Sequence, residues 1–155
     1  METDNSDIFK KGIIRIWIIW GAMFCSLFIY VVICHLLEST WVPVVTPNFP
    51  VDTLRDVLYG VSIVILFLSD YIRKFILKSE SQLERFTQIA SRTNMNPALF
   101  KYQTAVIISV ALSESIGVFG LIFFLLNKDI NTLYIFIATS AAAMLYHIPR
   151  MSQIK

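Results

Sequence analysis

Glu114 is the residue whose type and position most favour chemistry in this sequence. It lies ten residues after Thr104 and twelve before Leu126, and no other charge interrupts that apolar run. At a rise of about 1.5 Å per residue, a helix would place its carboxyl roughly 15 Å from either end. An ionised carboxylate at the centre of a bilayer costs at least about 2.5–3.5 kcal/mol, so such residues are typically protonated, paired or functional. Because desolvation favours the protonated form, Glu114 is a candidate for loading and releasing a proton.

The alternative interpretation of Glu114 is structural: a protonated or paired carboxyl can hold helices together. Its neighbours are small. Ser109, Ser113 and Gly117 follow each other at four-residue spacing, Gly120 lies three residues further on, and Ser115 places a hydroxyl directly after the glutamate. The spacing predicts a small-residue face along which another helix backbone approaches closely.

The composition is that of a membrane protein. Of 155 residues, 56% are hydrophobic and only 15% are charged, against roughly 25% charged in soluble domains. The apolar residues form long runs instead of amphipathic stripes. The formal charge is +2 and no basic patch is interleaved with aromatic residues, so we expect no nucleic-acid partner.

The runs predict an all-α integral membrane protein with a single membrane domain over residues 1–155. Transmembrane helices are expected at residues 16–37, 56–77, 97–126 and 132–148. Three prolines exclude a helix between the first two spans, with Asp52 as N-cap of the second. Asn96 and Pro97 are typical of the start of the third. Residues 78–91 are amphipathic and either extend the second helix or lie on the membrane surface.

The basic residues predict the orientation of these helices. Residues 73–101 contain six basic and two acidic residues, whereas the loops between helices 1 and 2 and between helices 3 and 4 contain one basic residue each. The positive-inside rule then places both termini and the central loop in the cytoplasm. Arg73 and Lys74 are interpreted as anchors whose charges reach the membrane surface, with Asp70 pairing with one of them. Tyr30 is assigned to an interfacial belt or to helix packing.

Residues 97–126 resemble the second, carboxylate-bearing helix of the proteolipid c subunit of rotary F- and V-type ATPases. In that family a Gln-Thr-Ala element enters the membrane at the same spacing before an Ala-Leu-x-Glu, which an aromatic-Gly-Leu follows. A polar loop with Arg and Pro precedes the helix, and Arg92 and Pro97 stand in comparable places. The matching residues are Gln103-Thr104-Ala105 and Ala111-Leu112-Ser113-Glu114-Ser115-Ile116-Gly117-Val118-Phe119-Gly120-Leu121-Ile122.

The resemblance implies that residues 56–77 and 97–126 form a c-subunit-like hairpin, with an additional helix at each end. It makes Glu114, with Ser115, an ion-binding candidate; in the family the glutamate carries a proton or sodium ion. No Gln partner occurs in residues 56–77, so sodium is unsupported. Cys25 and Cys34 lie in the first apolar run without a ligand cluster, and no metal or other cofactor is expected.

We therefore expect a subunit of a larger or oligomeric membrane complex, of the bacterial inner-membrane type, with the lipid bilayer and copies of itself or other membrane subunits as partners. A freestanding enzyme is not expected, because no phosphate loop, Ser/His/Asp set or pair of carboxylates with a water-filled site is visible. The alternative is a non-transporting structural or assembly subunit that keeps the third helix as a packing surface.

Overall fold

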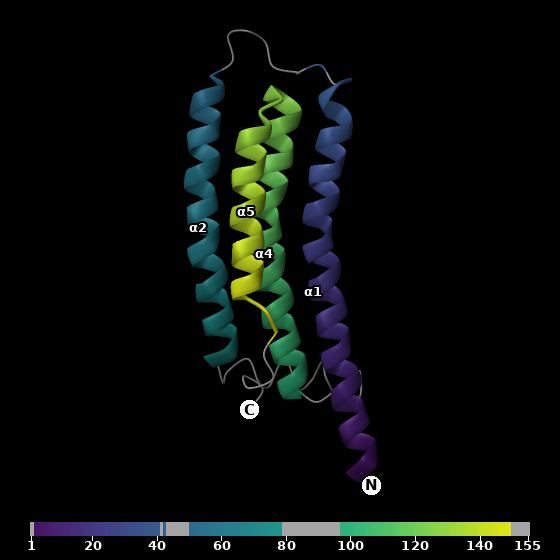
Figure 1. The fold of residues 1–155 in the computed structure, drawn as a ribbon. Coiled ribbons are helices and arrows are strands. Elements are labelled where there is room, and N and C mark those ends of the chain that lie inside the picture. Colours follow the sequence, from purple (N-terminus) through teal and green to yellow (C-terminus); the bar gives the residue numbers. More distant parts are fainter. Residues whose placement is uncertain (1, 41, 43–49, 79–96, 150–155) are drawn as a thin grey trace.

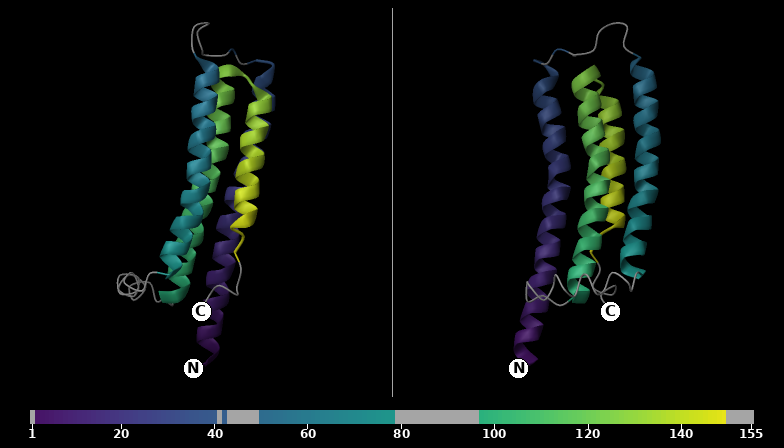
Figure 2. Two further views of the ribbon diagram at one scale, coloured as in Figure 1. Left: turned by 90° about the vertical axis from the view of Figure 1, so that its left-hand side faces the viewer. Right: turned by 180° about the vertical axis from the view of Figure 1, so that it is seen from behind.

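The computed structural model describes residues 2–40, 42, 50–78 and 97–149, with side chains from residue 10 onward. This part of the chain is all-helical, as predicted, and contains α1 (Glu2–Glu38), α2 (Val51–Lys78), α4 (Pro97–Asn127) and α5 (Ile130–Tyr146). The four helices run alternately up and down (Figure 1). α1 and α2 lie on opposite sides of the α4–α5 pair, and the view from behind shows α4 between them (Figure 2).

The first helix is longer than the sequence suggested. α1 begins at Glu2, whereas the apolar run predicted a start at residue 16. A helix satisfies its own backbone hydrogen bonds and residues 2–15 contain no proline, so the helix continues through the polar segment. The N-terminal turns extend beyond the ends of the other helices (Figure 1).

The second helix also starts earlier than predicted, at Val51 and not at residue 56. The backbone N–H of Leu54 donates to the carbonyl of Pro50 at 3.1 Å, so the first turn forms directly after that proline. Asp52 therefore lies within the first turn and is not the N-cap; its carboxylate instead pairs with Arg55 at 3.1 Å. Of the amphipathic segment at residues 78–91, Lys78 ends α2 and the rest lies outside the described residues.

The last two helices are joined by a two-residue turn in which Lys128 has a positive φ of 60°. Asp129 is the N-cap of α5: its carboxylate accepts from the backbone N–H groups of Asn131 and Thr132, at 3.0 and 3.2 Å. α5 thus begins before the predicted residue 132. It ends at Tyr146, two residues before the predicted end, because Pro149 disfavours helical geometry at residue 148.

Within the described residues, two helical stretches are long and apolar enough to cross a membrane, Lys10–Glu38 and Pro97–Asn127. α5 is a shorter apolar helix of 17 residues. α4 is the central element, since it contacts α1, α2 and α5. The hydrophobic core therefore surrounds α4. Most of the large, fully buried side chains belong to α4 or to the faces of α1 and α5 that are turned toward α4.

Candidate functional site

Glu114 lies at the contact between α4 and α1. Its Oε1 atom lies 2.5 Å from the hydroxyl oxygen of Ser26 and accepts a hydrogen bond from the hydroxyl of Tyr30 at 3.0 Å. The Ser26 hydroxyl also lies 2.6 Å from the carbonyl oxygen of Met23. Among the described residues, no Lys, Arg or His side chain forms an ion pair with this carboxyl. The glutamate is thus half-buried, and the described groups that hydrogen-bond to it are neutral hydroxyls.

Both hydroxyls come from one face of the first helix. Ser26 and Tyr30 are four residues apart, so they lie one above the other on α1. A further hydrogen bond holds α1 against α5: the indole N–H of Trp20 donates to the carbonyl oxygen of Met144 at 3.1 Å. Of the two roles expected for Tyr30, an interfacial belt or helix packing, its hydrogen bond to Glu114 of α4 supports helix packing.

Ser115 does not share the site. Its hydroxyl donates to the carbonyl oxygen of Leu112, one turn back on its own helix, at 2.7 Å. Glu114 and Ser115 are successive residues of α4, so their side chains point about 100° apart, and the hydrogen-bonding groups beside Glu114 belong to α1.

The small-residue face of α4 packs mainly against α5. Ser109, Ser113, Gly117 and Gly120 are all buried. The hydroxyl of Ser140 on α5 donates to the carbonyl oxygen of Ser113 at 2.6 Å. Such a direct bond from a side chain to a neighbouring helix backbone requires the two helices to approach closely, which the small side chains allow.

The residues that match the entry of the c-subunit helix lie at the start of α4. Pro97 is its first residue. The Thr104 hydroxyl donates to the carbonyl oxygen of Phe100 at 2.9 Å. The side-chain oxygen of Gln103 is buried and accepts no hydrogen bond from any described group.

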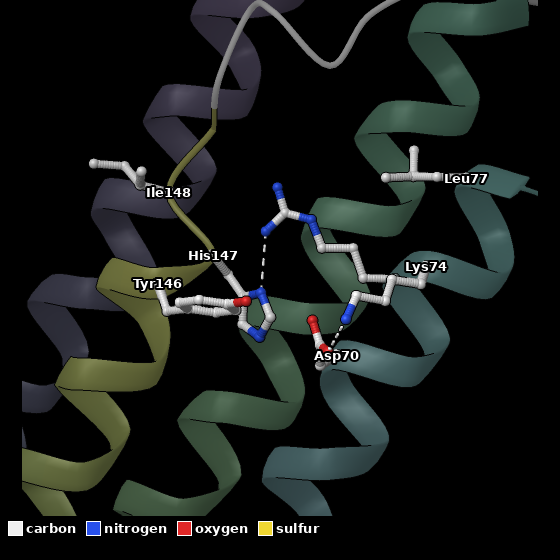
Figure 3. Close-up of a pocket in the computed structure, with 7 residues that line it drawn as sticks. Asp70, Lys74, Leu77, Tyr146, His147 and Ile148 are labelled. Atoms are coloured by element: carbon white, nitrogen blue, oxygen red, sulfur yellow. Dashed lines mark hydrogen bonds and ion pairs between the residues drawn. The ribbon is translucent and has the colours of Figure 1, made fainter.

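A second polar cluster lies between α2, α4 and the end of α5, at the end of the bundle where α1 begins (Figures 1 and 3). Arg73 donates to Nδ1 of His147 at 3.0 Å, and Nε2 of His147 lies 3.0 Å from the hydroxyl of Ser69. That hydroxyl donates to the backbone carbonyl of Ser109 at 3.1 Å. Arg73 is 7% exposed and His147 is 2% exposed.

The donors and acceptors assign the protonation of His147. A guanidinium has only donors, so Nδ1 must accept, and the ring proton is then on Nε2. Nε2–H donates to Ser69, whose own hydrogen is directed to Ser109. His147 is therefore neutral in this arrangement, and a continuous chain of donors runs from Arg73 of α2 to the backbone of α4.

The prediction that Arg73 is a surface anchor is wrong, and the expected pairing of Asp70 is with Lys74. Arg73 is not an anchor reaching the membrane surface, because its side chain is buried against His147. Asp70 pairs with Lys74, at 2.6 Å, and Lys74 remains exposed (Figure 3).

Sequence reasoning missed Ser26, Tyr30, Ser69 and the role of His147. A usable signal existed for the first two, because two hydroxyls at a spacing of four within an apolar run predict a polar spot on one helix face. Comparisons of the chain with family models, with curated proteins and with solved structures found no match.

Proposed function

We propose that this chain is an integral membrane protein whose four helices all cross the bilayer. It serves as a c-subunit-like subunit of a larger or oligomeric membrane complex, in which Glu114 binds and releases a proton. Large apolar side chains exposed along both α1 and α2 support the membrane placement, among them Phe28, Ile29, Val64 and Phe67. Apolar surfaces of this extent mark membrane or protein contacts.

The lengths of the helices agree with this placement. At about 1.5 Å per residue, the 17 residues of α5 extend roughly 26 Å, close to the hydrocarbon thickness of about 30 Å. The charges of α2 lie near its ends, with Asp52, Arg55 and Asp56 in the first turns and Asp70 in the last third. Between Val57 and Ser69 the helix carries no charge.

The single observation that carries proton binding is the position of the Ser26 hydroxyl. It lies 2.5 Å from Oε1 of Glu114 and 2.6 Å from the carbonyl oxygen of Met23, yet a hydroxyl has one hydrogen. Both short contacts can be hydrogen bonds if the Ser26 hydroxyl donates to the carbonyl oxygen of Met23 and a protonated Glu114 donates from Oε1 to the Ser26 hydroxyl oxygen. The protonated oxygen still accepts from Tyr30. This account supports a carboxyl that holds a proton at the α1–α4 contact.

Modification by a hydrophobic carbodiimide tests the proton-binding carboxyl. The reagent reacts with protonated carboxyls in apolar surroundings, so it should modify Glu114 in membranes, and more readily as the pH is lowered. Glu114→Gln should abolish the modification, because the reagent activates carboxyl groups and an amide has none. The helix should stay inserted, because the amide keeps the size and a hydrogen-bonding oxygen of the side chain. Glu38→Gln is the matched control, since Glu38 ends α1 and is exposed. Modification that persists in Glu114→Gln, or its absence from the wild type, would exclude the proton-binding role.

The membrane placement has an independent test in cysteine labelling. In a background without Cys25 and Cys34, a cysteine at position 42 should react with an impermeant reagent added to intact cells. A cysteine at position 10, at the other end of α1, should react only after permeabilisation. Release of the protein from membranes by alkaline carbonate would refute the placement, and reversed labelling would refute the orientation.

A second candidate function, a non-transporting structural or assembly subunit, is favoured by the packing of α4. Twelve of its 31 residues are buried against the other helices of its own chain. In that role Glu114 is a hydrogen-bonding contact to α1. Glu114→Gln would then leave the size of the purified complex and its thermal stability unchanged, and the wild-type carboxyl would be inert to the carbodiimide at every pH.

A further inference from the structure

Two hollows lie on either side of Lys74 near the end of α2. One is a pocket of about 190 Å³ between α2 and the end of α5, lined by Asp70, Arg73 and His147 among others (Figure 3). The other is an open groove of about 470 Å³ on the outer side of α2, lined by Tyr71, Lys74, Phe75 and Lys78. Because Lys74 lines both, its ammonium group can serve a ligand seated in either.

The charge around these hollows is positive. Of the described residues that line them, three are cations (Arg73, Lys74 and Lys78) and one, Asp70, is a carboxylate. The Lys74 side chain is 72% exposed although it pairs with Asp70. No described carboxylate lines the outer groove. A ligand bound there should therefore carry an anionic group.

Beside the two lysines, the outer groove is lined by the aromatic side chains of Tyr71 and Phe75. Tyr71 and Phe75 are 65% and 53% exposed, and their rings stack with centroids 6.2 Å apart. Exposed Phe67, four residues before Tyr71, and exposed Val64, three residues before Phe67, continue this face toward the middle of α2. From Val64 to Lys78 the stripe is about 20 Å long at 1.5 Å per residue. One end carries ammonium groups and the rest is apolar, which matches one leaflet from its head groups toward its centre.

We propose that this stripe binds one anionic phospholipid, with its phosphate between Lys74 and Lys78 and an acyl chain along Tyr71, Phe75 and Phe67. Basic groups next to a transmembrane helix attract anionic head groups, and the stacked aromatic rings provide a surface for the chain. The site rests on the membrane placement proposed above, but not on Glu114. It lies in the leaflet on the side where α1 begins.

The test uses the full chain purified in a non-ionic detergent. It is titrated with phosphatidylglycerol or with phosphatidylcholine of the same acyl chains, and bound lipid is counted by native mass spectrometry. The wild type should bind phosphatidylglycerol more tightly. Lys74→Gln and Lys78→Gln should each weaken that binding about fivefold, and the double variant more than either. Lys11→Gln is the matched control: it removes the same charge from an exposed residue at the same end of the bundle, and binding should not change.

Two further measurements separate the acyl-chain contact from simple anion binding. Phe75→Ala should weaken binding of phosphatidylglycerol while the charge is unchanged. Inorganic phosphate at millimolar concentration should not displace the lipid. Equal affinity for the two lipids, equal losses in Lys11→Gln and Lys74→Gln, displacement by phosphate alone, or full binding by Phe75→Ala would each overturn the proposal. Release by alkaline carbonate reports on membrane placement separately from lipid selectivity, so the two failures are distinguishable.

Discussion

Gly120 of α4 and Phe136 of α5 lie so close that a methyl group on the glycine would be 2.7 Å from Cβ of the phenylalanine. The carbonyl oxygen of Leu133 would be 3.3 Å away. Neither atom can rotate aside, since one is a backbone atom and the other is bonded directly to Cα. The contact between α4 and α5 therefore depends on the absence of a side chain at this position.

Gly120→Ala should lower the free energy of unfolding by about 1–3 kcal/mol, because overpacking forces the helices apart. Gly117→Ala should cost less: the nearest atom to an added methyl, at 2.6 Å, is Cδ2 of Leu27, the end of a flexible side chain. Gly60→Ala is the control, since no described atom lies within 4 Å of its added methyl. Thermal unfolding in detergent measures all three. Equal stability of Gly120→Ala and Gly60→Ala would contradict the packing of α4 on α5.

Ser69→Ala should lower stability by about 1–3 kcal/mol, because it leaves the buried Nε2–H of His147 without its acceptor. Ser62→Ala is a matched control on the same helix. Ser62 is also buried, but its hydroxyl donates only to the carbonyl of Leu58 in its own helix, at 2.7 Å. Its loss should cost little. If the two variants unfold at the same temperature, the chain of hydrogen bonds from Arg73 to Ser109 does not contribute to folding.

Tyr30→Phe should lower stability by about 0.5–1.5 kcal/mol, because one hydrogen bond to Glu114 is lost while the ring remains. The loss should disappear in a Glu114→Leu background, in which no acceptor is left for the hydroxyl. Tyr59→Phe serves as the control, since Tyr59 stacks on Phe136 and its hydroxyl forms no hydrogen bond with a described residue. A double-mutant cycle on unfolding temperatures checks the pair, and a coupling of zero would refute the contact.

Asp129→Asn should reduce stability at neutral pH but not in acid. Partial burial raises the pKa of Asp129, but hydrogen bonds from Thr132 and Asn131 and the nearby charge of Arg55 outweigh it, so the pKa lies below its ordinary value. A depressed pKa stabilises the fold above the unfolded pKa of about 3.9, and this contribution is lost as the pH falls through the folded pKa. Asparagine caps a helix about as well as aspartate, so the loss at neutral pH is that of a negative charge at the helix N-terminus, about 0.3–1 kcal/mol.

Unfolding of the wild type and of Asp129→Asn should therefore be followed from pH 7 downward. The difference in unfolding temperature should be constant above about pH 4 and should shrink below it. A difference that persists to the lowest pH would show that the carboxylate charge is not what stabilises the start of α5.

The sequence determined the existence and order of the helices. Apolar runs and prolines are local signals, and they placed α4 within one residue of its observed end. They also identified Glu114 as the one charge inside its apolar run. The ends of α1 and α5 were less predictable: a polar segment without proline continues a helix as readily as it ends one, and capping by Asp129 adds residues before the apolar run.

The partners of the polar side chains were decided only by the tertiary structure. Which face of α1 meets α4 depends on the packing of both helices, and that packing directs Ser26 and Tyr30 to Glu114. Arg73 and Lys74 are adjacent in the sequence, yet one is buried against His147 and the other is exposed. Their side chains point about 100° apart around α2, so the position of α5 beside the helix determines which of the two cations is buried.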